Sequence, residues 1–355
     1  MYNRGDYIRR ASTYLRNRFN PKARQISTLM IYATDLCDSR CKHCLIWEKR
    51  PVKYLPKEII FGLMKNKCIS RHTTVGLEGG EFLLHPESME IMEWFVKNHP
   101  KFELLSNCLK PEKLIEAVKQ ATPSRLFISL DGTEETYLNM RGKDGYDKVV
   151  SVLESLHSLL PISVMFCLSP WNTTEDLKHV AEVCKKFKVD LRVGVYSNIK
   201  FFDTEQQAYQ ETKDIHPPEI LREFEENYDY LVLYNEFRKG KLKMTCNSIA
   251  DTCVVLPNGD VPICLNLDTT LGNIFKNSLD EIYAKTETAD TIQHHRFNCN
   301  ACWINFHRKY DLILYRQLEK YFPKFAISKL FGFYQWSENA GEKYDAVLKR
   351  LEKTK

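Results

Sequence analysis

The sequence lacks the long apolar runs and the strong charge that mark membrane and nucleic-acid-binding proteins. No run of about eighteen apolar residues occurs among its 355 residues, which excludes a membrane-spanning helix. The opening stretch MYNRGDYIRRAS has no apolar core of a signal peptide, so we expect a cytoplasmic protein. A net charge of +5 is mild for this length and argues against a nucleic-acid partner. Internal repeats and low-complexity segments are also missing.

Short apolar runs do alternate with amphipathic stretches between about residues 28 and 200. We expect strands over 28–35, 73–79, 102–107, 125–132, 162–169 and 189–197. The stretches between them have helical patterns, and several open with Pro, Thr or Asp followed by acidic residues. Such strand–helix repeats predict parallel strands in a whole or partial α/β barrel or in a doubly wound sheet. In each of these folds the active site lies at the carboxyl ends of the strands.

The pattern changes after residue 200. A helix is expected over 217–240, and the PNGD turn at 257–260 predicts a hairpin between two short β-rich runs. We therefore divide the chain into a basic N-terminal helix, a barrel, a cysteine-bearing domain and a helical tail. The predicted ranges of these parts are 1–27, 28–240, 241–310 and 311–355.

The first of these parts is a basic helix with an apolar stripe at helical spacing. Such a helix can dock on a membrane surface or on an acidic partner. We expect it instead to pack on its own domain and to leave its charges solvated. The stripe consists of Tyr7, Ile8, Ala11, Tyr14, Leu15 and Phe19.

Three of the twelve cysteines stand close together after the first expected strand. Cys37, Cys41 and Cys44 lie within the stretch TDLCDSRCKHCLIWE, residues 34–48. In a reduced chain of this length, clustered cysteines indicate a metal-binding or redox site. Zinc normally takes four ligands, and His43 lies between two of the thiols. A three-cysteine iron–sulfur cluster would leave one iron open. From these residues alone both metals remain possible.

A CxxxCxxC pattern after the first strand of an α/β repeat resembles the radical S-adenosylmethionine (SAM) superfamily. The resemblance implies that Cys37, Cys41 and Cys44 hold a [4Fe–4S] cluster whose fourth iron is chelated by SAM. It also implies an electron donor such as flavodoxin or ferredoxin. The reduced cluster cleaves SAM to methionine and a 5′-deoxyadenosyl radical, and this radical removes a hydrogen atom from the substrate.

Motifs at the next three strand ends match the same family in order. EGGEFLLHPE is similar to its GGE motif, LLSNCL to its strand-end Ser/Thr-Asn, and SLDGTEETYLNMRG to the SLDG…RG pattern of one large subgroup. Glycines let backbone approach a ligand closely, and a carboxylate suits an ammonium group. The residues that the resemblance implies for SAM binding are Gly79, Gly80, Glu81, Ser106, Asn107, Ser129, Arg141 and, near the adenine, His43.

A second cysteine set follows residue 240. The spacing of Cys246, Gly259 and Cys264 resembles the opening of the SPASM/Twitch extensions of radical SAM enzymes, and CNACW adds Cys299 and Cys302. These four cysteines suit one fully ligated auxiliary [4Fe–4S] cluster, as in Twitch domains. The further cysteines of a full SPASM domain do not follow. Zinc held by the same thiolates is the competing interpretation, and Cys253 could replace Cys246.

Two residues of the sixth expected strand are candidates for substrate contact. Arg192 and Tyr196 share one face of that strand with Gly194 because side chains alternate with a period of two. This face could point into a polar barrel lumen, or it could meet solvent or a salt bridge.

These patterns together predict a radical SAM enzyme built as a partial (β/α)6 TIM-type barrel with a C-terminal Twitch/SPASM-like extension. A fully ligated auxiliary cluster cannot bind substrate, so we expect it to accept an electron in a net two-electron oxidation. This resembles the alcohol-oxidising dehydrogenases of aminocyclitol biosynthesis and the peptide and sulfatase maturases. No extra N-terminal peptide-recognition domain is evident, which favours a small-molecule or sugar-like substrate over a peptide. The third hypothesis is a zinc-stabilised, non-enzymatic binding protein.

Overall fold

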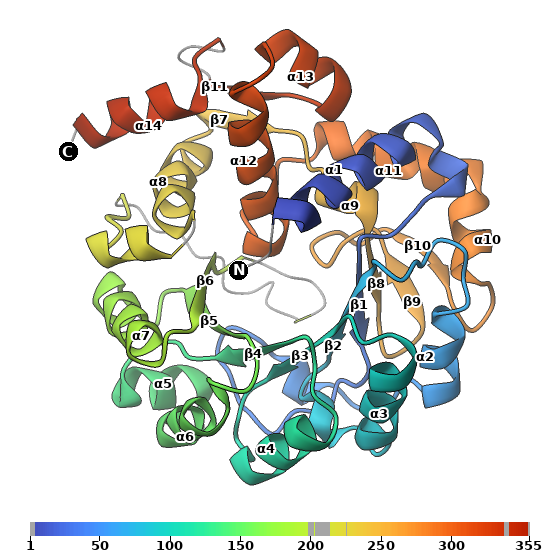
Figure 1. The fold of residues 1–355 in the computed structure, drawn as a ribbon, viewed down its shortest axis with the longest axis vertical. Coiled ribbons are helices and arrows are strands. Elements are labelled where there is room, and N and C mark those ends of the chain that lie inside the picture. Colours follow the sequence, from blue (N-terminus) through green and yellow to red (C-terminus); the bar gives the residue numbers. More distant parts are fainter. Residues whose placement is uncertain (1–3, 198–201, 203–213, 225, 337–340, 354–355) are drawn as a thin grey trace.

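A curled sheet of seven strands forms the centre of the molecule (Figure 1). The structure, a computed structural model, describes residues 4–197, 202, 214–224, 226–336 and 341–353. The strand order is β6-β5-β4-β3-β2-β1-β8, and all neighbouring strands are parallel. Their bounds are β1 (Thr28–Tyr32), β2 (Thr74–Glu78), β3 (Phe102–Ser106), β4 (Arg125–Ser129), β5 (Ile162–Leu168), β6 (Asp190–Val195) and β8 (Thr252–Val255). The six strands expected before residue 200 are confirmed, as is the partial TIM-type barrel.

Helices connect the first six strands and cover the outer face of the sheet (Figure 1). These helices are α2 (Lys57–Leu63), α3 (Ser88–Asn98), α4 (Pro111–Gln120), α5 (Glu134–Arg141), α6 (Tyr146–Leu156) and α7 (Thr174–Phe187). Their sequences place apolar residues three and four positions apart, so one stripe of each helix is buried against the strands. In α7, for example, Leu177, Val180 and Cys184 are buried, and a capping box at Thr173 starts the helix.

The seventh strand comes from the cysteine-bearing region and pairs with β1. The PNGD turn does form, with Gly259 at φ +82° and a hydrogen bond from Leu256 N to Asp260 O. The predicted hairpin is nevertheless wrong in its pairing, because β8 joins the barrel sheet. The strand after the turn, β9 (Asp260–Pro262), pairs instead with β10 (Thr270–Asn273).

Two helices lie across the opening of the curled sheet (Figure 1). The first, α12 (Asn305–Glu319), packs against β6 on one side and α9 (Ser248–Asp251) on the other. The second, α1 (Arg4–Phe19), packs beside α9 and α13 (Lys324–Phe331). The barrel is therefore closed by segments from both ends of the chain.

The N-terminal helix packs against the rest of the protein, as expected, but the expectation that its charges stay solvated is wrong for Arg10, whose side chain is only 16% exposed. Arg10 forms an ion pair of 2.9 Å with Asp251, and the buried Tyr14 stacks on Phe331. Two residues of the apolar stripe, Ile8 and Phe19, remain exposed.

The rest of the described chain supplies the remaining helices and strands. Its elements are α8 (Asn227–Arg238), β7 (Leu242–Met244), α10 (Leu279–Ala284), α11 (Thr286–Asn298), β11 (Tyr334–Trp336), α14 (Tyr344–Lys353) and the short 3-10 helices η1 (Pro21–Ala23), η2 (Ile46–Glu48), η3 (Phe82–Leu84) and η5 (Glu219–Glu223). β11 pairs antiparallel with β7. The helix expected over 217–240 is divided into η5 and α8.

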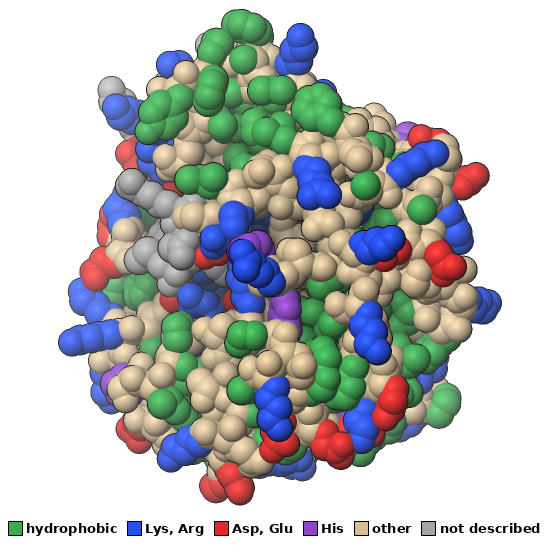
Figure 2. All heavy atoms as spheres, turned by 45° about the vertical axis from the view of Figure 1, so that its right-hand side comes forward, with side chains coloured by type: hydrophobic (Ala, Val, Ile, Leu, Met, Phe, Trp, Pro, Cys, Tyr) green, Lys and Arg blue, Asp and Glu red, His purple; other side chains and the backbone are tan. Residues whose placement is uncertain are grey.

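Hydrophobic side chains gather on one surface over α13 and the end of α12, at the top of Figure 2. The large exposed residues there are Tyr321, Phe322, Phe325 and Leu330. No helix in the described part of the chain is long and apolar enough to cross a membrane.

Candidate active site

The inner face of the curled sheet lines a cavity of about 820 Å³. It extends from the cysteine loop at the carboxyl ends of the strands to Thr28 and Thr74, which begin β1 and β2. Residues of α1 and α12 complete its wall. A volume of this size accommodates SAM together with a small substrate or the side chain of a larger one.

All three cysteines of the CxxxCxxC loop line this cavity. The loop has little secondary structure of its own and is held by the end of α5. Arg40 N donates to Arg141 O at 3.0 Å, and Lys42 N donates to Met140 O at 2.9 Å. Burial raises the pKa of the Cys44 thiol to about 12 and raises the pKa values of the Cys37 and Cys41 thiols as well. Three thiols on one loop, of which that of Cys41 is buried and those of Cys37 and Cys44 are half-buried, fit a cluster whose irons favour the thiolate form.

The glycines of the GGE motif pack against this loop. A Cβ on Gly80 would lie 2.3 Å from the carbonyl oxygen of Leu36, and a Cβ on Gly79 would lie 2.6 Å from that of Thr34. The close approach allows Gly80 N to donate to Thr34 O and Glu81 N to Leu36 O, each at 2.8 Å. Both glycines also line the cavity. Their small size thus positions the cysteine loop, in addition to the ligand approach expected from the sequence.

Glu81 projects a carboxyl oxygen that matches the expected ammonium ligand. Its Oε2 accepts a hydrogen bond of 2.8 Å from Asn107 N, whereas its buried Oε1 has no hydrogen-bond partner within the described residues. Burial raises the pKa of this carboxyl to about 7. Asn107 Nδ2 donates to Asp38 and lies 3.8 Å from Cys37 Sγ, and Ser106 Oγ accepts from Cys108 N. An orphaned carboxyl oxygen beside the cysteine loop fits a bound SAM ammonium.

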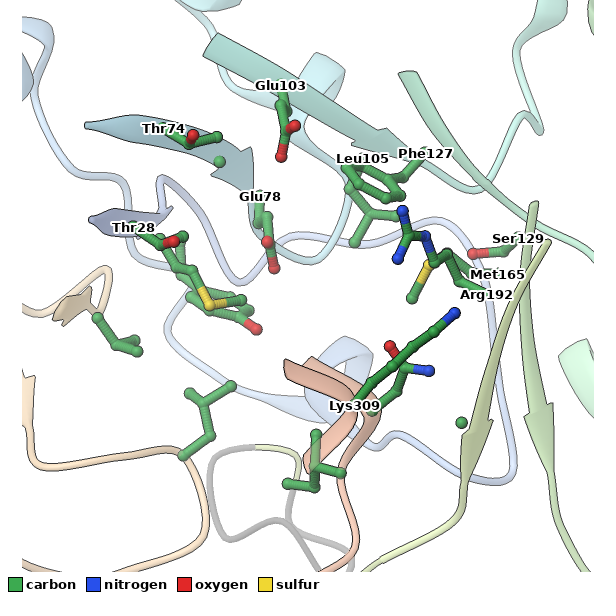
Figure 3. Close-up of a pocket in the computed structure, with 18 of the residues that line it drawn as sticks. Thr28, Thr74, Glu78, Glu103, Leu105, Phe127, Ser129, Met165, Arg192 and Lys309 are labelled. Carbon is green, nitrogen blue, oxygen red and sulfur yellow. The ribbon is translucent and has the colours of Figure 1, made fainter. Parts of the chain in front are cut away.

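Arg141 is held beside the same loop by the carboxylate of Asp131, a residue to which the sequence motifs gave no role. Asp131 is fully buried and accepts from Arg141 Nε at 2.7 Å and from Nη2 at 2.5 Å. Arg141 Nη1 then lies 3.9 Å from Cys41 Sγ. His43 also lines the cavity, and burial lowers its pKa to about 4, so the ring is neutral near pH 7. A neutral ring suits stacking on an adenine, and Ser129 faces the same cavity from the end of β4 (Figure 3).

Charged side chains line the middle of the cavity (Figure 3). Glu78 and Glu103 come from β2 and β3, whereas Arg192 and Lys309 come from β6 and α12. Burial raises the pKa of Glu78 to about 7, although a hydrogen bond with Tyr32 partly offsets this effect. The sequence analysis missed Glu78 and Lys309. A lone acid at the end of a strand offered a weak signal for Glu78, and Lys309 lies on a helix distant in sequence.

Arg192 and Tyr196 both reach the cavity wall. Arg192 Nε forms an ion pair of 2.8 Å with Asp190, and the Tyr196 ring packs edge-on against Trp171. The strand therefore presents this face to the lumen, and contact with a substrate stays a prediction.

The second cysteine set surrounds a separate, smaller cavity. The four cysteines that line it are Cys246, Cys264, Cys299 and Cys302, together with Arg308. Cys253 lies apart from them on β8, beside Tyr283 and Arg24. The structure thus groups Cys246 rather than Cys253 with the other three thiols. Four thiols around one cavity fit a fully ligated cluster.

Comparison with known families agrees with both cysteine sites. Residues 31–184 match the model of the radical SAM superfamily, and residues 246–303 match the SPASM model, described as an iron–sulfur cluster-binding domain. The chain belongs to the radical SAM superfamily. More particularly, it is a radical SAM protein with a C-terminal SPASM-type domain, and its cofactors are SAM and two [4Fe–4S] clusters. These matches support an enzyme rather than a zinc-stabilised binding protein.

Curated relatives match only part of their own length. A GTP 3′,8-cyclase of Microcystis aeruginosa is 32% identical over 134 residues, which cover 36% of this chain and 38% of the cyclase. The subtilosin biosynthesis protein AlbA of Bacillus subtilis is 23% identical over 271 residues, or 70% of this chain and 58% of AlbA.

Solved structures show the same fold. SuiB of Streptococcus suis bound to S-adenosylmethionine has a TM-score of 0.60 at 15% identity, covering 82% of this chain and 74% of SuiB. The protein anSMEcpe with bound AdoMet and a Cp18Cys peptide has a TM-score of 0.53 at 16% identity, covering 92% and 98% of the two chains.

Proposed function

We propose that the protein oxidises a small-molecule or sugar-like substrate by two electrons inside the barrel cavity. The observation that carries this proposal is that four cysteines line the second cavity. Four protein thiolates leave an auxiliary cluster no open position for substrate, so electron transfer is its natural role. The substrate then occupies the barrel cavity of about 820 Å³, whose wall is completed by α12.

In this proposal the first site holds SAM with the residues of the strand-end motifs. Cys37, Cys41 and Cys44 would hold the cluster, which would supply the electron for the cleavage of SAM. Glu81 accepts the ammonium group through its orphaned Oε1, and Arg141, oriented by Asp131, binds the carboxylate. The remaining assignments are Gly79, Gly80, Ser106 and Asn107 beside the methionyl part, Ser129 at the ribose and His43 at the adenine.

The domain ranges proposed with this function are 28–240 for the SAM-binding barrel and 241–310 for the auxiliary-cluster domain. Thiolates at both sites need a reducing compartment, so we place the protein in the cytoplasm with flavodoxin or ferredoxin as electron donor.

Oxidation of an alcohol carbon removes a hydrogen atom, a proton and an electron from the substrate. SAM, when bound, would supply the radical that takes the hydrogen atom, and a cluster held by Cys246, Cys264, Cys299 and Cys302 would take the electron. We assign the proton to the carboxylate of Glu78, which faces the cavity and has a pKa raised to about 7 by burial. Arg192 and Tyr196, further along the wall, are the proposed substrate contacts.

Deuterium transfer tests the class of substrate directly. The anaerobically reconstituted protein, with about eight irons per chain from its two clusters, is incubated with SAM, dithionite and a fractionated perdeuterated cell extract. We expect deuterium in 5′-deoxyadenosine from the small-molecule fraction, and none with the Cys41→Ala variant. Transfer only from the peptide and protein fraction would contradict a small-molecule substrate.

Peptide modification is the second candidate. The observation that favours it is the similarity to AlbA, a protein of bacteriocin biosynthesis, which extends over 70% of this chain. If the substrate is a peptide, the cavity receives one side chain, and the deuterium label comes from the peptide fraction. The assignments of the two cysteine sets are the same in both cases.

A further inference from the structure

Arg308 is buried beside the four cysteines of the auxiliary site. Its exposed fraction is 1%, and it lines the same small cavity as the four thiols. The guanidinium donates to three acceptors: Cys302 O at 3.1 Å, Met244 O at 3.2 Å and Asn300 Oδ1 at 3.1 Å. These acceptors lie on the two segments that carry Cys246 and the Cys299–Cys302 pair. The side chain thus fixes both segments against each other.

The charge of Arg308 is only loosely compensated. Within the described part of the chain, the one carboxylate inside ion-pair distance is that of Asp311, whose Oδ2 lies 4.0 Å from Arg308 Nη1. The hydrogen bonds of the guanidinium go instead to neutral carbonyl and amide oxygens. A buried cation costs free energy unless a negative charge lies nearby. The arrangement therefore indicates an anionic group in the adjoining cavity.

We propose that the positive charge of Arg308 raises the reduction potential of the auxiliary cluster and makes it an electron acceptor. A four-iron cluster with four thiolate ligands carries net negative charge and gains one more negative charge on reduction. A buried cation stabilises the reduced form more than the oxidised one, because local net charge sets the potential. Arg308 is thus a positioning residue that acts through the cluster. The inference rests on the four-cysteine site of the proposed function.

The test uses the full-length chain with Cys37, Cys41 and Cys44 replaced by alanine, so that only the auxiliary cluster is present. Arg308→Gln and Arg308→Lys are compared in this background by anaerobic redox titration, followed by the electron paramagnetic resonance of the reduced cluster. Arg316→Gln is the matched control. It removes the same charge from the same helix eight residues later, about 12 Å away along the axis, where Arg316 pairs with Glu226, Asp229 and Asp345.

We expect Arg308→Gln to shift the ratio of reduced to oxidised cluster at least tenfold at a fixed ambient potential, a lowering of about 59 mV for one electron. Arg308→Lys and Arg316→Gln should keep the original potential. If the glutamine variant binds no cluster while the lysine variant binds it at the original potential, the requirement for charge is still supported. An unchanged potential in Arg308→Gln overturns the inference, and so do equal shifts in Arg308→Gln and Arg308→Lys. Loss of the cluster in Arg308→Lys also overturns it. If the parent chain itself binds no iron, the four-cysteine assignment fails instead.

Discussion

Gly80→Ala tests whether the cysteine loop depends on a close backbone approach. The added Cβ would lie 2.3 Å from the oxygen and 2.6 Å from the carbonyl carbon of Leu36, and 2.8 Å from Cys37 Cβ. The first two are backbone atoms, so no change of side-chain rotamer relieves the clash. The loop has to move away from the end of β2, and the hydrogen bonds from Gly80 N and Glu81 N to that loop lengthen.

The expected cost has two parts. Overpacking of a tight contact costs about 1–3 kcal/mol, and a weakened backbone hydrogen bond adds about 1 kcal/mol. The free energy of unfolding of the apoprotein should therefore fall by about 2–4 kcal/mol. Because the displaced segment carries Cys37, we also expect iron binding to fall from about eight to about four atoms per chain.

Urea unfolding of the apoprotein and an iron and sulfide assay of the reconstituted protein measure these two effects. Gly62→Ala is the matched control, because a Cβ on Gly62 of α2 meets nothing within 4 Å. That variant should be unchanged or more stable by up to about 1 kcal/mol. A Gly80→Ala protein with full iron and the wild-type urea midpoint would refute the close-approach argument.

Four further substitutions test other parts of the two sites. Cys246→Ala should lower the iron content to about four atoms per chain, whereas Cys253→Ala should leave it unchanged; the reverse result would exchange the two assignments. Burial raises the pKa of Glu78 to about 7 in the folded protein, so the folded state holds this proton more tightly, and stability is lost as the pH rises from about 4.5 to about 7. Glu78→Gln should remove that loss of stability, which is at most about 3 kcal/mol because solvent in the cavity weakens the effect. Parallel curves of stability against pH for the wild-type protein and Glu78→Gln would contradict this expectation. Asp131→Ala leaves the buried Arg141 without its carboxylate, so it should destabilise the apoprotein by about 3–5 kcal/mol and suppress 5′-deoxyadenosine release; full release would show that Arg141 needs no orientation by Asp131.

The strands of the barrel were predictable because their signals are local. Each of the first six strands is a short apolar run followed by a helix with its own periodicity, and the chain order alone gives parallel neighbours. The pairing of β8 with β1 was not predictable in this way. Its register joins Thr252 to Thr28, so the contact spans most of the chain. A turn motif such as PNGD reports the reversal of the backbone but not the partner of each flanking strand.

The same difference between local and long-range signals decides which parts of the site were predictable. Motifs placed the residues proposed to bind SAM at strand ends, and the period of two placed Arg192 and Tyr196 on the cavity wall. Spacing alone could not choose between Cys246 and Cys253, because both are compatible with a loop that reaches Cys264. Only the three-dimensional arrangement separates them, since Cys253 is fixed in β8 while Cys246 faces the other thiols.

The helix α12 connects the two sites in a way that neither cysteine motif reveals. Asn305, Lys309 and Ile313 recur every four residues along α12, and all three line the barrel cavity. Arg308 is the immediate neighbour of Lys309, but it faces the cavity of the four cysteines. Successive residues of a helix point about 100° apart, so one helix presents different faces to the two cavities. In the proposed function, the electron therefore passes between two sites that share this helix as a wall. The segment after residue 240 thus forms a wall of the barrel cavity as well as the cavity of the four cysteines.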